Sequence, residues 1–261
     1  MDINWLSRTE LLYGKEKIER LQKAHVLVVG LGGVGAYAAE QLCRAGIGEM
    51  TLVDADTVEL TNLNRQLPAL RSTLGKPKVE VICQRMKDIN PDIILHPVHE
   101  FIRDERTPDL LDSAKFDYVV DAIDSLSPKV YLIYFALQRQ MRLVSVMGAG
   151  GKINPELVKV TDIKKTHQCK LAHAIRKRLH RMGITTGFKA VFSPEPVIEE
   201  AIMIDANPDI NKLSTVGTVS YMPAIFGCHA AATVINDLSL SRLSQNEVVK
   251  IFDNLIPTIN C

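Results

Sequence analysis

A glycine-rich loop directly after an apolar, β-branched run constrains this chain more than any other feature. Residues 25–30 read HVLVVG, and the loop carries Gly30, Gly32, Gly33 and Gly35. Glycines at this spacing permit a tight turn and a close approach of the backbone to phosphate, and the following helix offers its first N–H groups to the same anion. Asp54, after the next apolar run, can accept ribose hydroxyls. The pattern predicts a strand, loop, helix and strand that together bind a nucleotide.

Strand and helix signals alternate along the first half of the chain. Short β-branched runs predict buried strands at residues 25–30, 50–55, 92–98, 118–123 and 142–148. Helical patterns separate them at residues 33–45, 76–89 and 128–140. Strands joined by single helices imply right-handed crossovers and a parallel sheet covered on both faces. We therefore expect an α/β fold with a doubly wound, Rossmann-like and mainly parallel sheet.

The pattern changes after the glycines that follow the fifth predicted strand. Further strands are predicted at residues 157–160 and 188–192, with a basic helix between them. A polar loop is expected at residues 193–214, and an apolar helix begins near Tyr221. We expect the strands of this second half to extend the sheet in antiparallel fashion.

The chain shows no low-complexity linker that would mark a domain boundary. Residues 1–261 are therefore expected to form a single domain. Residues 1–150 would be its nucleotide-binding half, and residues 151–261 would serve substrate binding and dimerisation.

Composition narrows the class of protein. The net charge is only +1, so an RNA partner would require a local basic patch. The five cysteines include no CxxC pair, which argues against a disulfide scaffold or a structural zinc and favours the reducing cytoplasm. The histidines show no ligand spacing, so no metal site is expected among them. The start lacks the apolar core of a signal peptide, and Pro223 and Asp237 make residues 219–238 a predicted buried helix rather than a membrane span.

Charged side chains after the second strand suit a triphosphate. A helix amino terminus largely satisfies the two phosphates of a dinucleotide, whereas ATP also needs cationic side chains and a metal. Arg65 could clamp the phosphates, Lys78 could neutralise charge at the α-phosphate, and Asp124 could hold Mg²⁺. Each alone would more often be a solvated surface charge, and only their combination with the glycine loop indicates an adenylating enzyme. The candidate nucleotide-binding residues are Gly30, Gly32, Gly33, Gly35, Asp54, Asp56, Asn62, Asn64, Arg65, Gln66 and Lys78.

Five short motifs together resemble the ATP-dependent adenylating superfamily of ubiquitin-activating-type enzymes. In chain order they read GLGGVG, RAGIG, DADTVELTNLNRQ, LGKPK and DAIDS. The resemblance implies that ATP binds at the glycine loop, that Arg65 and Lys78 contact phosphate, and that Asp124 holds the metal. It also implies a homodimer in which Arg8 reaches the ATP of the second subunit. The catalytic residues would be Arg8, Arg65, Lys78 and Asp124.

The second half resembles one branch of this superfamily, the tRNA threonylcarbamoyladenosine dehydratases. The segments that carry this likeness are VTDIKKT, KLAHAIRKRLHRMGI, VFSPEPV and STVGTVSYMPAIFG. The branch implies ATP-driven cyclisation of N6-threonylcarbamoyladenosine in tRNA through an acyl-adenylate. A sulfur-transfer protein is a further partner to consider.

A basic segment supports an RNA substrate on physical grounds. Residues 163–194 contain no acidic side chain, whereas lysine, arginine and histidine are frequent there. Leu171, Ile175, Leu179 and Met182 recur at helical spacing and should face the core. The outward residues would then contact RNA phosphates, and the candidates are Lys170, His173, Lys177, Arg178 and Arg181. A solvated surface helix is the alternative interpretation.

Two other functions remain open from the sequence. One is adenylation of the carboxy-terminal glycine of a ubiquitin-like sulfur carrier, although the CxxC zinc motifs common in such enzymes are absent. The other is an NAD-dependent oxidoreductase, which would leave Arg65, Lys78 and Asp124 unexplained. Cys228 is expected in the core, whereas Cys169 precedes the basic helix in a loop where its thiol could be exposed and reactive.

Overall fold

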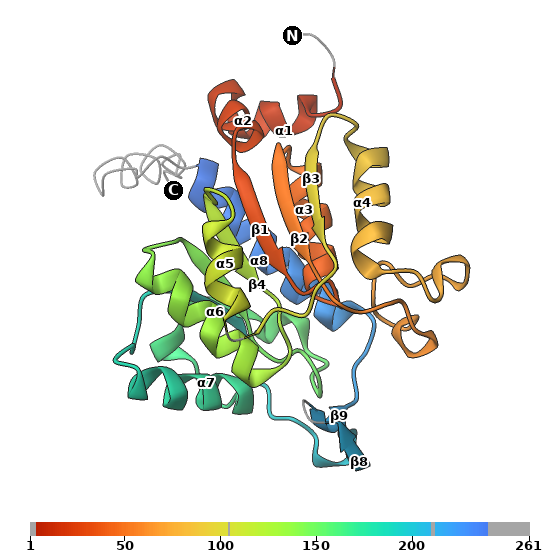
Figure 1. Ribbon diagram of the computed structural model, residues 1–261, viewed down its shortest axis with the longest axis vertical. Coiled ribbons are helices and arrows are strands. Elements are labelled where there is room, and N and C mark those ends of the chain that lie inside the picture. Colours follow the sequence, from red (N-terminus) through yellow and green to blue (C-terminus); the bar gives the residue numbers. More distant parts are fainter. Residues whose placement is uncertain (1–3, 104, 210–211, 240–261) are drawn as a thin grey trace, which may run out of the picture.

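A computed structural model describes residues 4–103, 105–209 and 212–239 of the chain. Its centre is a seven-stranded sheet in the order β3-β2-β1-β4-β5-β7-β6 (Figure 1). The neighbouring pairs from β3 to β7 are parallel, and only β6 runs antiparallel to its neighbour β7. The strands are β1 His25–Val29, β2 Glu49–Val53, β3 Ile94–Val98, β4 Tyr118–Asp121, β5 Leu143–Val146, β6 Lys159–Asp162 and β7 Lys189–Phe192. The predicted doubly wound α/β fold is confirmed.

Helices cover both faces of the sheet because alternate strand residues face opposite sides. On one face, α3, α4 and α8 pack against side chains such as Val26 and Val28 of β1. On the other, α5, α6 and α7 pack against Leu27 and Val29. The helices are α1 Ser7–Tyr13, α2 Lys15–Gln22, α3 Gly35–Arg44, α4 Lys78–Ile89, α5 Arg106–Asp112, α6 Leu126–Gln138, α7 Lys170–Arg181 and α8 Tyr221–Ser239.

The chain reverses its direction across the sheet at β1. It proceeds from β1 to β2 and β3 on one side, and then returns to place β4 and β5 on the other. In open α/β sheets, ligands bind beyond the carboxyl ends of the strands at such a switch point. The loops after β1, β2 and β4 therefore define the candidate site.

The second half confirms the antiparallel extension but differs in detail from expectation. β7 joins the sheet parallel to β5, so β6 alone supplies the antiparallel edge. The prediction of a polar loop at residues 193–214 was wrong. Instead, β8 Ile202–Asp209 and β9 Lys212–Val216 form an antiparallel hairpin in a separate two-stranded sheet. Turn-forming residues in this stretch favour a loop locally. The two segments nevertheless form strands because their backbones pair with each other, with one register shift between Ile204 and Asp209.

No helix in the part of the chain that the structure describes combines the length and apolar character needed to cross a membrane.

Candidate active site

The glycine loop follows β1, and its backbone is packed too tightly for side chains at two positions. Gly30 has a φ of 91°, and a Cβ there would lie 2.8 Å from the carbonyl oxygen of Ala122, after β4. A Cβ on Gly35 would lie 1.7 Å from the carbonyl oxygen of Gly30. These contacts bring the start of α3 against the ends of β1 and β4, so the first N–H groups of α3 are held at the switch point.

Asp54 stabilises this loop from the end of β2. Its Oδ2 accepts a hydrogen bond from the backbone N–H of Leu31 at 2.5 Å, and its Oδ1 accepts one from Asp56 at 2.8 Å. Burial raises the pKa of Asp54, and the charge of Lys78 and these two hydrogen bonds oppose that rise. The half-buried carboxylate thus joins the glycine loop to the loop after β2, where it retains acceptor capacity for a ligand hydroxyl.

Residues 59–66 form a compact turn beside the glycine loop. The buried Asn62 accepts a hydrogen bond from the N–H of Glu59, so its side chain holds the turn. Arg65 donates to the carbonyl of Thr61 at 2.9 Å and to Oδ1 of Asn64 at 2.8 Å. The Cγ of Arg65 also lies 3.5 Å from the place a Cβ on Gly33 would take. The structure therefore brings Arg65 next to the glycine loop.

Gln66 lies over Gly32. A Cβ built on Gly32 would lie 3.9 Å from Nε2 of Gln66, its nearest neighbour, so the space above this glycine is open. The Oε1 of Gln66 is buried and lacks a hydrogen-bond partner among the described residues. Because a buried unpaired acceptor is costly, this oxygen is suited to a ligand donor.

Lys78 begins α4 and is only 4% exposed. Its Nζ forms an ion pair with Oδ2 of the exposed Asp56 at 2.6 Å, and its backbone N–H donates to the carbonyl of the same residue. The ammonium is therefore held at the loop after β2, close to Asp54.

Asp124 lies in the loop between β4 and α6 and is exposed. Sequence reasoning missed the buried ion pair beneath it, where Nζ of Lys129 lies 2.9 Å from Oδ2 of Asp121. Lys129 also donates to the carbonyl of Ile123, and Ser145 donates to Asp121. Lys129 is the one charged residue of α6, and this was the available signal. Together these bonds fix the loop that presents Asp124.

The basic helix α7 presents its charged side as expected. Ile175 and Leu179 are buried, and Leu171 and Met182 pack against the same core. The candidate RNA-contacting side chains are all exposed, namely Lys170, His173, Lys177, Arg178 and Arg181. Arg178 donates to Oγ of Ser127 at 2.6 Å, near the start of α6. The basic surface therefore continues to the loop that carries Asp124.

A cavity of about 390 Å³ lies against α7. Its lining combines the apolar Ile163 and Ile184 with basic side chains, including Lys164, His173, Lys177 and Arg181. Cationic rims over apolar floors suit nucleic acid, since phosphate and base faces can both be contacted.

Two expectations for cysteines were wrong. Cys169 is buried, because the residue that precedes α7 packs into the core beside Ile163 and Ala172 rather than into solvent. Cys228 is exposed, because α8 turns this position away from α3 while Gly227 faces it. A thiol role for Cys169 would therefore require its exposure.

Arg8 is not brought to the glycine loop of its own chain. It is exposed on α1, which lies at the amino ends of the strands, at the opposite end of the sheet from the glycine loop (Figure 1).

The ThiF family model matches residues 6–257 of this chain. The chain belongs to the ThiF family. The expected resemblance to the adenylating superfamily is thus confirmed.

Curated relatives and solved structures agree with this placement. The chain is 37% identical to the tRNA threonylcarbamoyladenosine dehydratase of Bacillus subtilis, over 93% of this chain and 99% of that one. It is similar to the crystal structure of the Escherichia coli tRNA N6-threonylcarbamoyladenosine dehydratase in complex with ATP, with a TM-score of 0.81, 36% identity, and coverage of 89% and 93% of the two chains. Similarity to the Escherichia coli molybdopterin-synthase adenylyltransferase, 39% identical, extends over 49% of this chain.

Proposed function

We propose that this ThiF-family chain is an ATP-dependent dehydratase that cyclises N6-threonylcarbamoyladenosine in tRNA. The observation that carries the proposal is the extent of similarity, since dehydratases match almost the whole chain. The adenylyltransferase match covers only about half of it. We expect the part of the chain outside the adenylyltransferase match to select the substrate.

ATP fits the loops around β1 as a substrate. The tight glycine backbone offers N–H groups to phosphate, and Asp54 has acceptor capacity for ribose hydroxyls. The unpaired Oε1 of Gln66 gives a ligand donor a buried partner above Gly32. We assign phosphate contacts to Arg65 and Lys78, whose side chains lie beside the glycine loop and Asp56.

Mg²⁺ fits the loop after β4 through Asp124. Asp124 is an exposed carboxylate, and oxygen ligands are those Mg²⁺ prefers. Asp121 is unsuited to this role, because Lys129 and Ser145 already occupy it in the interior. When bound, the ion would neutralise negative charge on the departing pyrophosphate.

The proposed reaction has two steps. The threonine carboxylate of the modified nucleoside attacks the α-phosphorus of ATP, and pyrophosphate leaves. A nitrogen or oxygen of the threonylcarbamoyl group then attacks the activated acyl carbon, and AMP leaves with one oxygen of the original carboxylate. The nucleophile belongs to the substrate, so the chain itself supplies position and positive charge.

The decisive experiment incubates the protein with ATP, Mg²⁺ and tRNA that carries the open nucleoside. We expect loss of water from the nucleoside by mass spectrometry, with a heavy-oxygen label in the threonine carboxylate recovered in AMP. Lys78→Ala and Asp124→Ala should each lower the rate about 10²–10³-fold, because they remove charge stabilisation. The matched control is Lys76→Ala, an exposed lysine two residues before Lys78.

Other outcomes would decide against the proposal. Pyrophosphate release stimulated by a ubiquitin-like carrier and not by tRNA would favour carrier adenylation. Binding of NAD without binding of ATP would favour an oxidoreductase. Full ATP–pyrophosphate exchange by Asp124→Ala would contradict its metal role.

We assign the tRNA contact to the exposed side of α7 and its adjoining cavity. Neutralising Lys177 and Arg181 together should weaken tRNA binding and reduce the slope of log Kd against log salt by about one per lost phosphate contact. Kd measured by filter binding over a salt series tests this. Neutralising Lys15 and Lys23, which are exposed at the two ends of the distant α2, is the control. An equal loss in both double variants would indicate nonspecific attraction.

The proposed assembly is a homodimer in the cytoplasm. Arg8 belongs to α1, and that helix lies at the opposite end of the sheet from the glycine loop (Figure 1), which suits a role in a second subunit's site. The four described cysteines are free thiols, as a reducing compartment favours. A sulfur-transfer protein remains a proposed further partner, and copurification of one with this chain would support it.

A further inference from the structure

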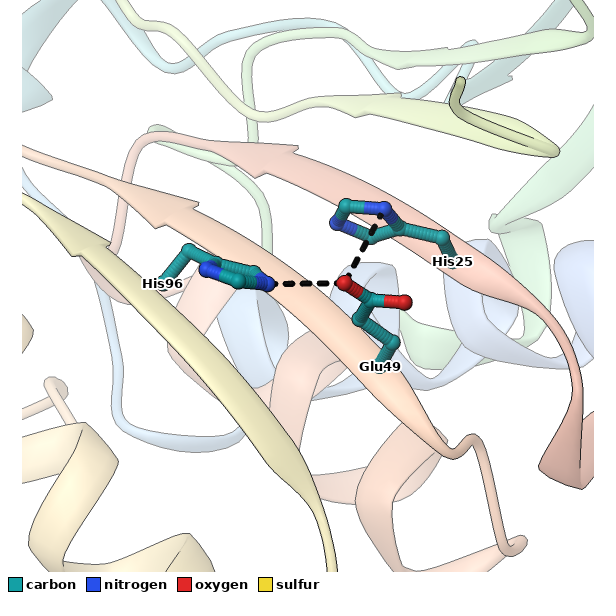
Figure 2. A group of neighbouring side chains, drawn as sticks. All are labelled: His25, Glu49 and His96. Carbon is teal, nitrogen blue, oxygen red and sulfur yellow. Dashed lines mark hydrogen bonds and ion pairs between the residues drawn. The ribbon is translucent and has the colours of Figure 1, made fainter. Parts of the chain in front are cut away.

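Three side chains from adjacent strands meet away from the nucleotide site. His25 begins β1, Glu49 begins β2 and His96 lies in β3, and all three point toward one another (Figure 2). The prediction that the histidines form no metal site was based on their spacing along the sequence. Sequence spacing does not reveal this cluster, because pairing of β1, β2 and β3 brings together residues that are far apart in sequence.

The distances between the ligand atoms suit a single small cation. Nδ1 of His25 lies 3.6 Å from Oε1 of Glu49, and Nε2 of His96 lies 2.7 Å from the same oxygen. Zinc–nitrogen and zinc–oxygen bonds of about 2.0–2.2 Å in a tetrahedron place ligand atoms about 3.3–3.5 Å apart. The observed separations lie on either side of that value, so small side-chain rotations suffice.

His25 is already oriented by a second partner, as metal-binding histidines usually are. Its Nε2 lies 2.9 Å from Oγ1 of Thr51, and its ring packs edge-on against Phe116. This leaves Nδ1 directed toward Glu49 at a distance too long for a hydrogen bond. A hydrogen-bonded ion pair therefore joins His96 to Glu49, whereas Nδ1 of His25 faces the same carboxylate without a hydrogen bond to it.

The three side chains of the cluster differ in their exposure to solvent. His25 is 7% exposed, whereas the side chains of Glu49 and His96 are 35% and 49% exposed. An ion can thus enter from the His96 side, and a water molecule can complete the coordination there.

We propose that His25, Glu49 and His96 form a Zn²⁺ site at the amino ends of β1 to β3. Two imidazoles and one carboxylate are a ligand set that favours zinc over Mg²⁺ or Ca²⁺. The site is separate from the nucleotide loop, since β1 spans about 16 Å between them. Bound at these residues, zinc joins three strands through three side chains and leaves one coordination position to water, so we expect it to stabilise this end of the sheet.

Zinc binding to the whole chain, prepared without an affinity tag and stripped with a chelator, tests the proposal. We expect one equivalent of Zn²⁺ to bind by calorimetry and to raise the thermal midpoint. Co²⁺ should give the visible absorption of a four-coordinate N/O site. His96→Ala and Glu49→Gln alter the exposed and the half-buried ligand and leave the buried His25 in place, so these variants should fold, and each should weaken zinc binding at least about tenfold.

His99→Ala is the matched control, because His99 is exposed on the same segment and bonds to the carbonyl of Ala55. It should bind zinc as the unaltered chain does. The proposal fails if the unaltered chain binds no zinc, or if His96→Ala and Glu49→Gln bind it with unchanged affinity. Because these measurements use neither ATP nor tRNA, their outcome is independent of the proposed dehydratase activity.

Discussion

At the scale of single residues, the interior ion pair of Lys129 and Asp121 supports the loop that presents Asp124. Both side chains are fully buried, and their nearest charged atoms lie 2.9 Å apart. Lys129→Met would leave the Asp121 carboxylate buried without a counter-charge, so we expect a loss of about 3–5 kcal/mol in the free energy of unfolding. Urea denaturation measures this loss.

A second variant distinguishes charge from packing at this pair. Asp121→Asn combined with Lys129→Met removes both charges, while the asparagine Oδ1 still accepts from the N–H of Ile123 and its Nδ2 donates to Oγ of Ser145, so it should recover part of the lost stability. A Lys129→Met protein as stable as the unaltered chain would contradict the role assigned to the pair.

Single residues also show what could be predicted from the sequence. Arg65 lies beside the glycine loop and Lys78 beside Asp56 in the loop after β2, because loops at the carboxyl ends of parallel strands converge. The cluster around His25 could not be predicted, because it depends on which strands become neighbours. The burial of Cys169 could not be predicted either, since it depends on how α7 packs against the core.

At the scale of elements, Glu40 of α3 joins its helix to α4. Nε of Arg85, on α4, donates to Oε2 of Glu40 at 2.5 Å, and Arg44 bonds to Oε1. Burial alone would raise the pKa of Glu40, but the hydrogen bonds and charges of Arg85 and Arg44 hold it below the usual 4.5. Folded protein therefore resists protonation of this group more than unfolded protein does.

The sign of the pH dependence follows from that shift. The stability contributed by Glu40 is present above the unfolded-state pKa and is lost as pH falls through the lower folded-state pKa. Arg85→Gln should reduce the decline of the thermal midpoint between about pH 5 and pH 3. Arg20→Gln, which removes an exposed pair with Glu16 inside α2, should leave the decline almost unchanged. Equal effects of both variants would contradict the proposed link between helices.

Elements were predicted well where local pattern and tertiary packing agree. α7 followed its helical spacing because the apolar stripe packs on the core. The β8–β9 hairpin was missed, since among the described strands β8 and β9 pair only with each other, and their turn-forming residues obscure the strand pattern.

At the scale of the whole molecule, the proposed exchange of Arg8 between subunits can be tested by complementation. Arg8→Ala and Lys78→Ala proteins should each be nearly inactive in cyclisation. After partial unfolding and joint refolding, hybrid dimers would contain one intact site. Random pairing should then restore about a quarter of the unaltered activity.

The control is refolding of each variant alone, which should restore nothing. Joint refolding that restores no activity, while size-exclusion chromatography shows dimers, would contradict the exchange. Such a result would leave the assignment of Lys78 within its own chain unaffected.

The contact of α8 with the nucleotide loop has a consequence for synthesis of the chain. Pro223 lies 3.0 Å from the place of a Cβ on Gly33, and Gly227 meets the backbone of Val34 so closely that a Cβ would approach its oxygen to 2.4 Å. At about 5–20 residues per second, a ribosome needs about 10–40 s to proceed from the glycine loop to α8. During that interval the side of α3 that packs against α8 remains uncovered, so we expect newly made chains to depend on chaperone protection until α8 has been synthesised.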